Sequence, residues 1–141
     1  MSAATADREA KRSEGKLKAY GVAASTAIRK GTLVGLNASG YLVSMTDAAN
    51  LTFVGVAYEG IDNSSGSNGA RQARVYKEGE FEFAYGGGDA TVAKLGNEVF
   101  AQDNQTVDED AALTTNDYKV GALVEVVSAS KVRVRIDNYV R

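Results

Sequence analysis

Four residue types are absent from the 141 residues of this chain: histidine, cysteine, tryptophan and proline. Without histidine and cysteine, the protein lacks the side chain that changes charge near neutral pH, the strongest thiol nucleophile, and the usual nitrogen and sulfur ligands of zinc, copper and iron. The enzyme chemistries that depend on these groups are therefore excluded. We expect a protein that is not an enzyme, with no catalytic residue, no cofactor and no bound metal.

The sequence also lacks any long apolar run. No segment approaches the roughly 18 consecutive apolar residues of a membrane helix, and the N-terminus has no apolar core of a secretory signal. The formal charge of −2 gives no broad attraction to nucleic acid. We therefore expect neither a membrane nor a nucleic acid as partner. A composition of 44% apolar and 24% charged residues is typical of a globular protein with a hydrophobic core.

Charge divides the chain into two parts. Residues 1–18 contain five cations and three anions, whereas the remaining residues contain eleven cations and fifteen anions. The first part has no apolar stripe that a helix could bury, so we interpret 1–18 as a polar, basic N-terminal arm and 19–141 as the folded domain. The arm is either an untethered terminus or a tether that becomes ordered on an acidic or grooved partner. Its cations are Arg8, Lys11, Arg12, Lys16 and Lys18.

After the arm, apolar residues alternate with polar ones, and the segments are bounded by Gly, Asn, Asp and Ser. This pattern is typical of short strands joined by turns. It predicts an all-β fold: a single compact β-sandwich or barrel, jelly-roll-like, of about nine short and mainly antiparallel strands, with an extended N-terminal arm. We expect these strands near residues 19–26, 32–37, 41–46, 53–60, 71–77, 80–85, 98–102, 119–127 and 131–136.

Several connections have specific turn signals. Gly40 can supply the positive φ of a tight turn, so 32–37 and 41–46 should form a hairpin. The dipeptide Glu78-Gly79 should likewise join 71–77 to 80–85, and residues 128–130 should close a last hairpin. One helical turn is expected at 91–95, ended by Gly96.

Two strands carry charge on one face. The pleat places Lys131, Arg133 and Arg135 opposite three apolar residues, and the acidic counterpart consists of Glu78, Glu80 and Glu82. If the strands are neighbours, the two charged faces can pair; if they are apart, each is an exposed strip available to a charged partner. We favour solvated structural faces, because strand exteriors are normally polar.

A second acidic group comprises Asp103, Asp108, Glu109 and Asp110. Oxygen ligands of this kind can bind calcium, but the spacing lacks the alternating ligands, central glycine and terminal glutamate of a calcium loop. A solvated turn is the better interpretation. A carboxylate pair for glycoside hydrolysis stays open, because two acids need only meet in space.

Tyrosines provide a further alternative. A carbohydrate-binding or receptor-binding β-module would also be all-β and without catalytic residues, and exposed aromatic rings would form its stacking surface. The candidates are Tyr20, Tyr58, Tyr85 and Tyr118. We favour a core or interface role for these rings.

The order of the segments resembles a known family. IRKGTLV at 28–34 precedes NASGYLV at 37–43 and FVGVA at 53–57, which leads into IDNSSG at 61–66; GNEVFAQDNQTV at 96–107 and the final pair of segments, 120–126 and 132–136, follow. These segments resemble the capsid decoration (cement, or head-stabilising) proteins of tailed bacteriophages. The resemblance covers about residues 19–137. The charged arm and the absence of proline depart from the family pattern.

The resemblance implies a function and partners. Proteins of that family are small all-β domains that add to the outside of an expanded icosahedral capsid as symmetric oligomers, and they have no catalytic residues. We therefore expect a structural virion protein on the outer capsid surface, made in the host bacterial cytoplasm, that bridges neighbouring subunits of the major capsid protein. It would act as a homo-oligomer, dimer or trimer. The hypothesis for its contacts is that Arg8, Lys11, Arg12, Lys16 and Lys18 meet acidic groups of the shell.

Overall fold

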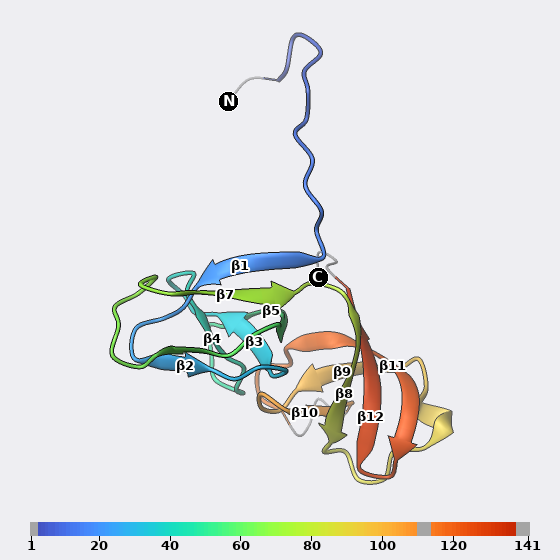
Figure 1. Ribbon diagram of the computed structural model, residues 1–141. Coiled ribbons are helices and arrows are strands. Elements are labelled where there is room, and N and C mark those ends of the chain that lie inside the picture. The colour runs from blue at the N-terminus through green and yellow to red at the C-terminus, as the bar shows by residue number, and fades with distance from the viewer. Residues whose placement is uncertain (1–2, 110–113, 138–141) are drawn as a thin grey trace.

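The computed structural model describes residues 3–109 and 114–137, which form two β-rich halves that follow one another along the chain (Figure 1). The described residues contain twelve strands and one short 3₁₀ helix. This confirms the predicted all-β fold. In the same residues, no helix has the length and apolar character to span a membrane.

The first half is an open sheet with a small strand pair beside it. The sheet has the order β1-β7-β5-β3-β4, and all its neighbouring strands are antiparallel. Strands β2 and β6 pair antiparallel as a separate ribbon. The bounds are β1 Leu17–Gly21, β2 Thr26–Ile28, β3 Leu33–Leu36, β4 Leu42–Ser44, β5 Thr52–Ala57, β6 Ile61–Asn63 and β7 Gln72–Tyr76.

The second half is a closed barrel with the order β10-β8-β12-β11-β9. Its strands pair antiparallel except β8 and β10, which are parallel. The 3₁₀ helix η1 precedes β9. The bounds are β8 Gly79–Tyr85, η1 Val92–Lys94, β9 Glu98–Ala101, β10 Thr106–Asp108, β11 Lys119–Ser128 and β12 Lys131–Ile136.

Each of the nine predicted strands overlaps an observed one, and the prediction missed β2, β6 and β10. The missed strands have three residues each, so the period of two that marks a strand is hard to recognise in them. The predicted turns at 37–40 and 128–130 close the β3–β4 and β11–β12 hairpins. Gly40 has φ +85°, and Oδ1 of Asn37 accepts the backbone N–H groups of Ser39 and Tyr41 at 3.0 Å each.

The predicted connection at Glu78-Gly79 has a different role. Strand β7 pairs with β1 and β5, and β8 pairs with β10 and β12, so these consecutive strands do not form the expected hairpin. Gly79 has φ +139°, a backbone conformation that L side chains rarely adopt. The expected hairpin is wrong because the chain passes here from the open sheet into the barrel. The predicted single helical turn is confirmed as η1, and Gly96 beyond it has φ +87°.

The central strands of the open sheet, β3 and β5, carry buried residues on both faces. Val34, Ala57 and Val75 belong to one apolar cluster, which Ile28 of β2 and Ile61 of β6 help to cover. Leu33, Met45 and Val56, from the other face, belong to a second cluster that they share with barrel residues. That shared cluster also contains Phe83, Tyr85, Ala90, Val99, Ala101, Val107, Val120, Leu123, Val132, Val134 and Ile136. The two halves are therefore held together by one continuous apolar interface.

Polar contacts cross the same interface. The backbone N–H of Leu33 donates to the carbonyl of Asn104 at 2.8 Å. The hydroxyl of Tyr118 accepts the N–H of Leu51 and donates to the carbonyl of Ala48. The carboxylate of Asp47 accepts backbone N–H groups from the segment just before β11. These hydrogen bonds fix the orientation of the barrel on the sheet, whereas apolar burial supplies most of the stabilisation.

The shared cluster predicts that the halves unfold together. Replacing Leu33, which is fully buried, by alanine should lower the free energy of unfolding by about 2–5 kcal/mol. Urea denaturation followed by far-UV circular dichroism and by tyrosine fluorescence should show one coincident transition at a lower midpoint. Val92→Ala is the matched control, because Val92 is 75% exposed and its truncation should change stability by less than about 0.5 kcal/mol. Two separate transitions in the wild-type protein would contradict the shared core.

Candidate functional site

The N-terminal arm is the part of the described chain that lies outside the packed structure. Residues 3–16 are exposed and contain no helix or strand, and Figure 1 shows them leaving β1 and projecting away from both halves. The carbonyl of Lys16 accepts the backbone N–H of Lys77 at 2.9 Å, and Lys18 lies within β1 opposite Val75. Of the five predicted contact residues, Arg8, Lys11 and Arg12 are therefore on the arm, and the two lysines are at its base.

The cations of the arm differ in their pairing from most of the described cations of the β domain. None of the five forms an ion pair with a residue in the described ranges 3–109 and 114–137. Six cations of the β domain do form ion pairs with carboxylates of the same domain: Arg74, Lys94, Lys119, Lys131, Arg133 and Arg135. The arm therefore presents its positive charge to solvent, where a partner can reach it.

The two charged strand faces lie side by side. In the β8–β12 register, Arg133 is opposite Glu82 and Arg135 is opposite Glu80. Lys131 contacts Glu82 at 3.3 Å, and Nε of Arg133 donates to Glu125 at 2.9 Å. The faces thus form a charge-balanced, exposed strip and not a free basic one.

Glu78, which we grouped with this strip, lies outside it because β8 begins at Gly79. Ion pairs this exposed contribute at most about 1 kcal/mol each. The strip is therefore a structural surface with little stabilising effect.

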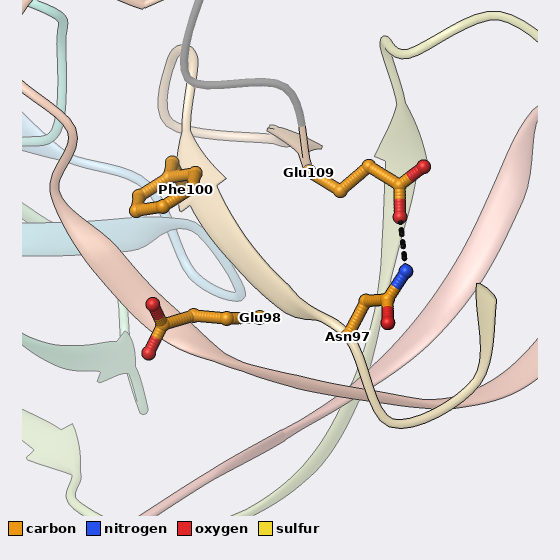
Figure 2. Close-up of a pocket in the computed structure, with 4 residues that line it drawn as sticks. All are labelled: Asn97, Glu98, Phe100 and Glu109. Atoms are coloured by element: carbon orange, nitrogen blue, oxygen red, sulfur yellow. Dashed lines mark hydrogen bonds between the residues drawn. The ribbon is translucent and has the colours of Figure 1, made fainter.

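A hollow of about 560 Å³ on the barrel is lined by Asn97, Glu98, Phe100 and Glu109 (Figure 2). Figure 2 shows the carboxylates of Glu98 and Glu109 turned to opposite sides of the hollow. Nδ2 of Asn97 donates to Glu109 at 2.8 Å, and Lys94 forms an ion pair with Glu109 at 3.1 Å. Glu98 pairs with Lys119 at 3.4 Å. Each carboxylate therefore already has a partner of its own.

The protonation states in this cluster are those of a structural ion pair. The hydrogen bond from Asn97 is the main cause that lowers the pKa of Glu109, with Lys94 adding to it. The hydrogen bond to Tyr85 is the main cause that raises the pKa of Lys94, and burial raises the pKa of Tyr85. At neutral pH the carboxylate is ionised, and the amine and the phenol are protonated. General acid–base catalysis needs a group with a pKa near the working pH, and these shifts move each group away from it. The geometry gives the glycoside-hydrolysis alternative no support.

The predicted acidic cluster is dispersed in the fold. Asp103 accepts the backbone N–H groups of Gln105 and Thr106 at 2.8 Å each, as a turn residue does. Asp108 is fully buried in β10, contrary to the expected solvated turn, and Asp110 lies outside the described residues. Within the described ranges, no group of three or more Asp or Glu side chains is arranged to hold a metal ion.

The four candidate tyrosines are engaged within the protein. Tyr85 is buried in the shared core, and Tyr118 packs against it. The ring of Tyr58 makes an edge contact with Tyr76 and lies under the guanidinium of Arg74. Tyr20 packs against the other cluster and accepts a hydrogen bond from Lys77. These contacts match the core or interface role and leave no free aromatic platform among the four.

A second hollow, of about 280 Å³, lies at the base of the arm. Its lining joins arm residues to Lys18, Tyr20 and Lys77, of which the sequence reasoning missed Lys77 as a site residue. The sequence contained a signal for its burial. Residue 77 lies an even number of positions from the buried Ala73 and Val75, so its side chain is expected on the same face of the strand. The residue is only 8% exposed, and its Nζ donates to the Tyr20 hydroxyl at 2.9 Å and to the Val54 carbonyl at 2.6 Å.

The lowered pKa of Glu109 predicts a pH-dependent stability. A carboxyl whose folded pKa lies below its unfolded value stabilises the fold above the unfolded pKa, near 4.5, and loses that contribution as pH falls through the folded pKa. Glu109→Gln should therefore be less stable than wild type at pH 7, and the difference should shrink below about pH 4.5. Thermal unfolding between pH 3 and pH 7 measures it. Glu125→Gln, which alters an exposed carboxylate on another face, is the control; a constant difference at all pH values would contradict the prediction.

No protein-family model and no curated protein sequence matches the chain. Among solved structures, the chain is similar to the head fiber gp8.5 N base of bacteriophage phi29, with a TM-score of 0.48 and 14% sequence identity. The alignment covers 86% of this chain and 95% of that one. A likeness of this size is too small to transfer a partner or a binding residue.

Proposed function

We propose that the protein is a non-catalytic structural component of a tailed-phage virion that binds the outer surface of the capsid. There it would stabilise the shell by bridging neighbouring major capsid protein subunits, as a symmetric dimer or trimer. The resemblance of residues 19–137 to capsid decoration proteins supports this proposal. The ion pairs of Glu98 and Glu109 are compatible with it, because they give both carboxylates of the barrel hollow a structural partner.

The arm is the observation that carries the proposal. It is an exposed chain segment whose cations have no carboxylate partner among the described residues, attached to a rigid sheet through β1. A segment of this kind can lie along a partner and become ordered there. We propose that Arg8, Lys11 and Arg12 contact acidic groups on the shell.

Stabilisation would follow from differential affinity. A protein that binds the assembled lattice better than free shell subunits shifts the equilibrium toward the lattice. Each contact can be weak, because simultaneous binding through two or three copies raises the effective affinity by about 10²–10⁴. Closed symmetry is the usual arrangement of soluble homo-oligomers and would supply the copies.

The direct test is to mix the purified protein with empty expanded capsids of the phage that encodes it. We expect saturable binding, added density on the outer surface at symmetry-related positions, and capsids that resist heating better. Electron microscopy, sedimentation and calorimetry measure these three properties. Absence of binding at micromolar concentrations, or binding without a rise in capsid melting temperature, would contradict the proposed role.

The arm is tested separately. Deleting residues 1–12 removes Arg8, Lys11 and Arg12 but preserves β1, Lys16 and the residues 13–15 that line the hollow at the base of the arm, so the β domain should keep its melting temperature. We expect capsid binding at least roughly tenfold weaker, because the segment that reaches across the shell is lost.

The matched variant replaces Arg8, Lys11 and Arg12 with glutamine at unchanged length. It should show most of the same loss, and the binding of the wild-type protein should weaken as salt increases. Equal binding by all three proteins would remove the arm from the interface.

A further inference from the structure

We propose that the hollow formed by Lys18, Tyr20 and Lys77 at the base of the arm is a binding site for a carboxylate group. The assignment of that carboxylate to an Asp or Glu side chain of the shell rests on the proposed function. The site itself rests on the side chains that line it, because they include a buried cation without an anionic partner.

The buried cation is Lys77. An ammonium group has three N–H donors, and the described contacts of this one are the Tyr20 hydroxyl and the Val54 carbonyl, both uncharged. The Tyr20 ring, 5.2 Å away, adds a cation–π contact. No carboxylate among the described residues lies within ion-pair distance of this amine. Burial of a charge is unfavourable unless the charge is paired, so the arrangement is incomplete without an anion.

The hollow gives an anion access to this amine. It is lined by Lys77 and Tyr20 from the sheet, by Lys18 on the edge strand β1, and by residues 13–15 of the arm. Lys18 is exposed, so its amine can turn toward a bound group from the open side. Two lysines thus line a space of about 280 Å³, which is ample for a carboxylate: Lys77, whose amine is held by two hydrogen bonds, and the exposed Lys18.

The lining also indicates which anion fits. Glu14 is one of the lining residues, and its negative charge disfavours a doubly charged ligand such as phosphate more than a singly charged one. The β domain is acidic as well, with fifteen anions and eleven cations after residue 18. A single carboxylate presented by a protein surface suits these charges. It would be bound beside the arm, so the site would fix the point from which the arm crosses the partner.

The test uses the full chain and sodium acetate as the probe. Lysine side-chain NMR of the wild-type protein should show saturable shifts at Lys77 and Lys18 on titration with acetate, measured against sodium chloride at equal ionic strength. Lys77→Met keeps the aliphatic stem and should weaken acetate binding at least tenfold. Lys18→Gln, at an exposed position that leaves the fold intact, should weaken it severalfold. Lys30→Met, at an exposed lysine elsewhere, should leave it unchanged.

Different results would overturn the site, the carboxylate assignment and the shell as the source of the carboxylate. The absence of saturable acetate shifts in the wild-type protein would overturn the site. So would an acetate affinity equal to that of the wild-type protein in both the Lys77→Met and the Lys18→Gln variants. Tighter binding of inorganic phosphate than of acetate would overturn the carboxylate assignment. With capsids, Lys18→Gln should bind severalfold more weakly than wild type. Unchanged capsid binding by this variant would overturn the shell as the source of the carboxylate, whereas failure of the wild-type protein to bind capsids would instead refute the proposed function.

Discussion

The fold depends on one apolar interface, in which the open sheet presents Leu33, Met45 and Val56 to the barrel. Their chain neighbours Val34 and Ala57 point the opposite way. They belong to the other apolar cluster, which the β2–β6 ribbon helps to cover. The central strands β3 and β5, covered on both sides, have little freedom to move. The edge strand β1 is held in register with β7, and the arm therefore starts from a fixed position and direction.

The charged side chains are of two kinds: those that form ion pairs within the protein and those that a partner can still bind. On the barrel, Arg133 and Glu82 belong to a strip in which opposite charges lie on neighbouring strands, and Lys94 and Glu109 pair beside the hollow of Figure 2. These groups compensate one another and attract no charged partner strongly. Among the described residues, positive charge without an ion pair is found along the arm, at the exposed Arg29, Lys30 and Arg71, and at the buried Lys77. The base of the arm brings the buried one together with cations of the arm, so it is where the protein has most to gain from an acidic surface.

Much of the fold could be predicted because local patterns determine it. Alternation locates the longer strands, and glycines such as Gly40 and Gly96 mark turns with positive φ. Pairing between distant segments could not be predicted, because a period of two gives the faces of a strand but not its neighbours. Asn63 illustrates the limit: it lies in a segment with the composition of a flexible loop. Its buried amide nevertheless donates to carbonyls of residues 22, 23 and 67 and organises that loop. Lys77 gains its role in the same way, through contacts made only in the folded sheet.

The passage at Glu78-Gly79 has a consequence for synthesis. Strands β1 to β7 precede it and β8 to β12 follow it, so the ribosome completes the sheet before the barrel. Until the barrel emerges, the nascent sheet exposes the apolar face that includes Leu33 and Val56, and such surfaces associate with one another or with chaperones. Premature termination within β8 to β12 should therefore leave an aggregation-prone fragment and not a smaller working protein.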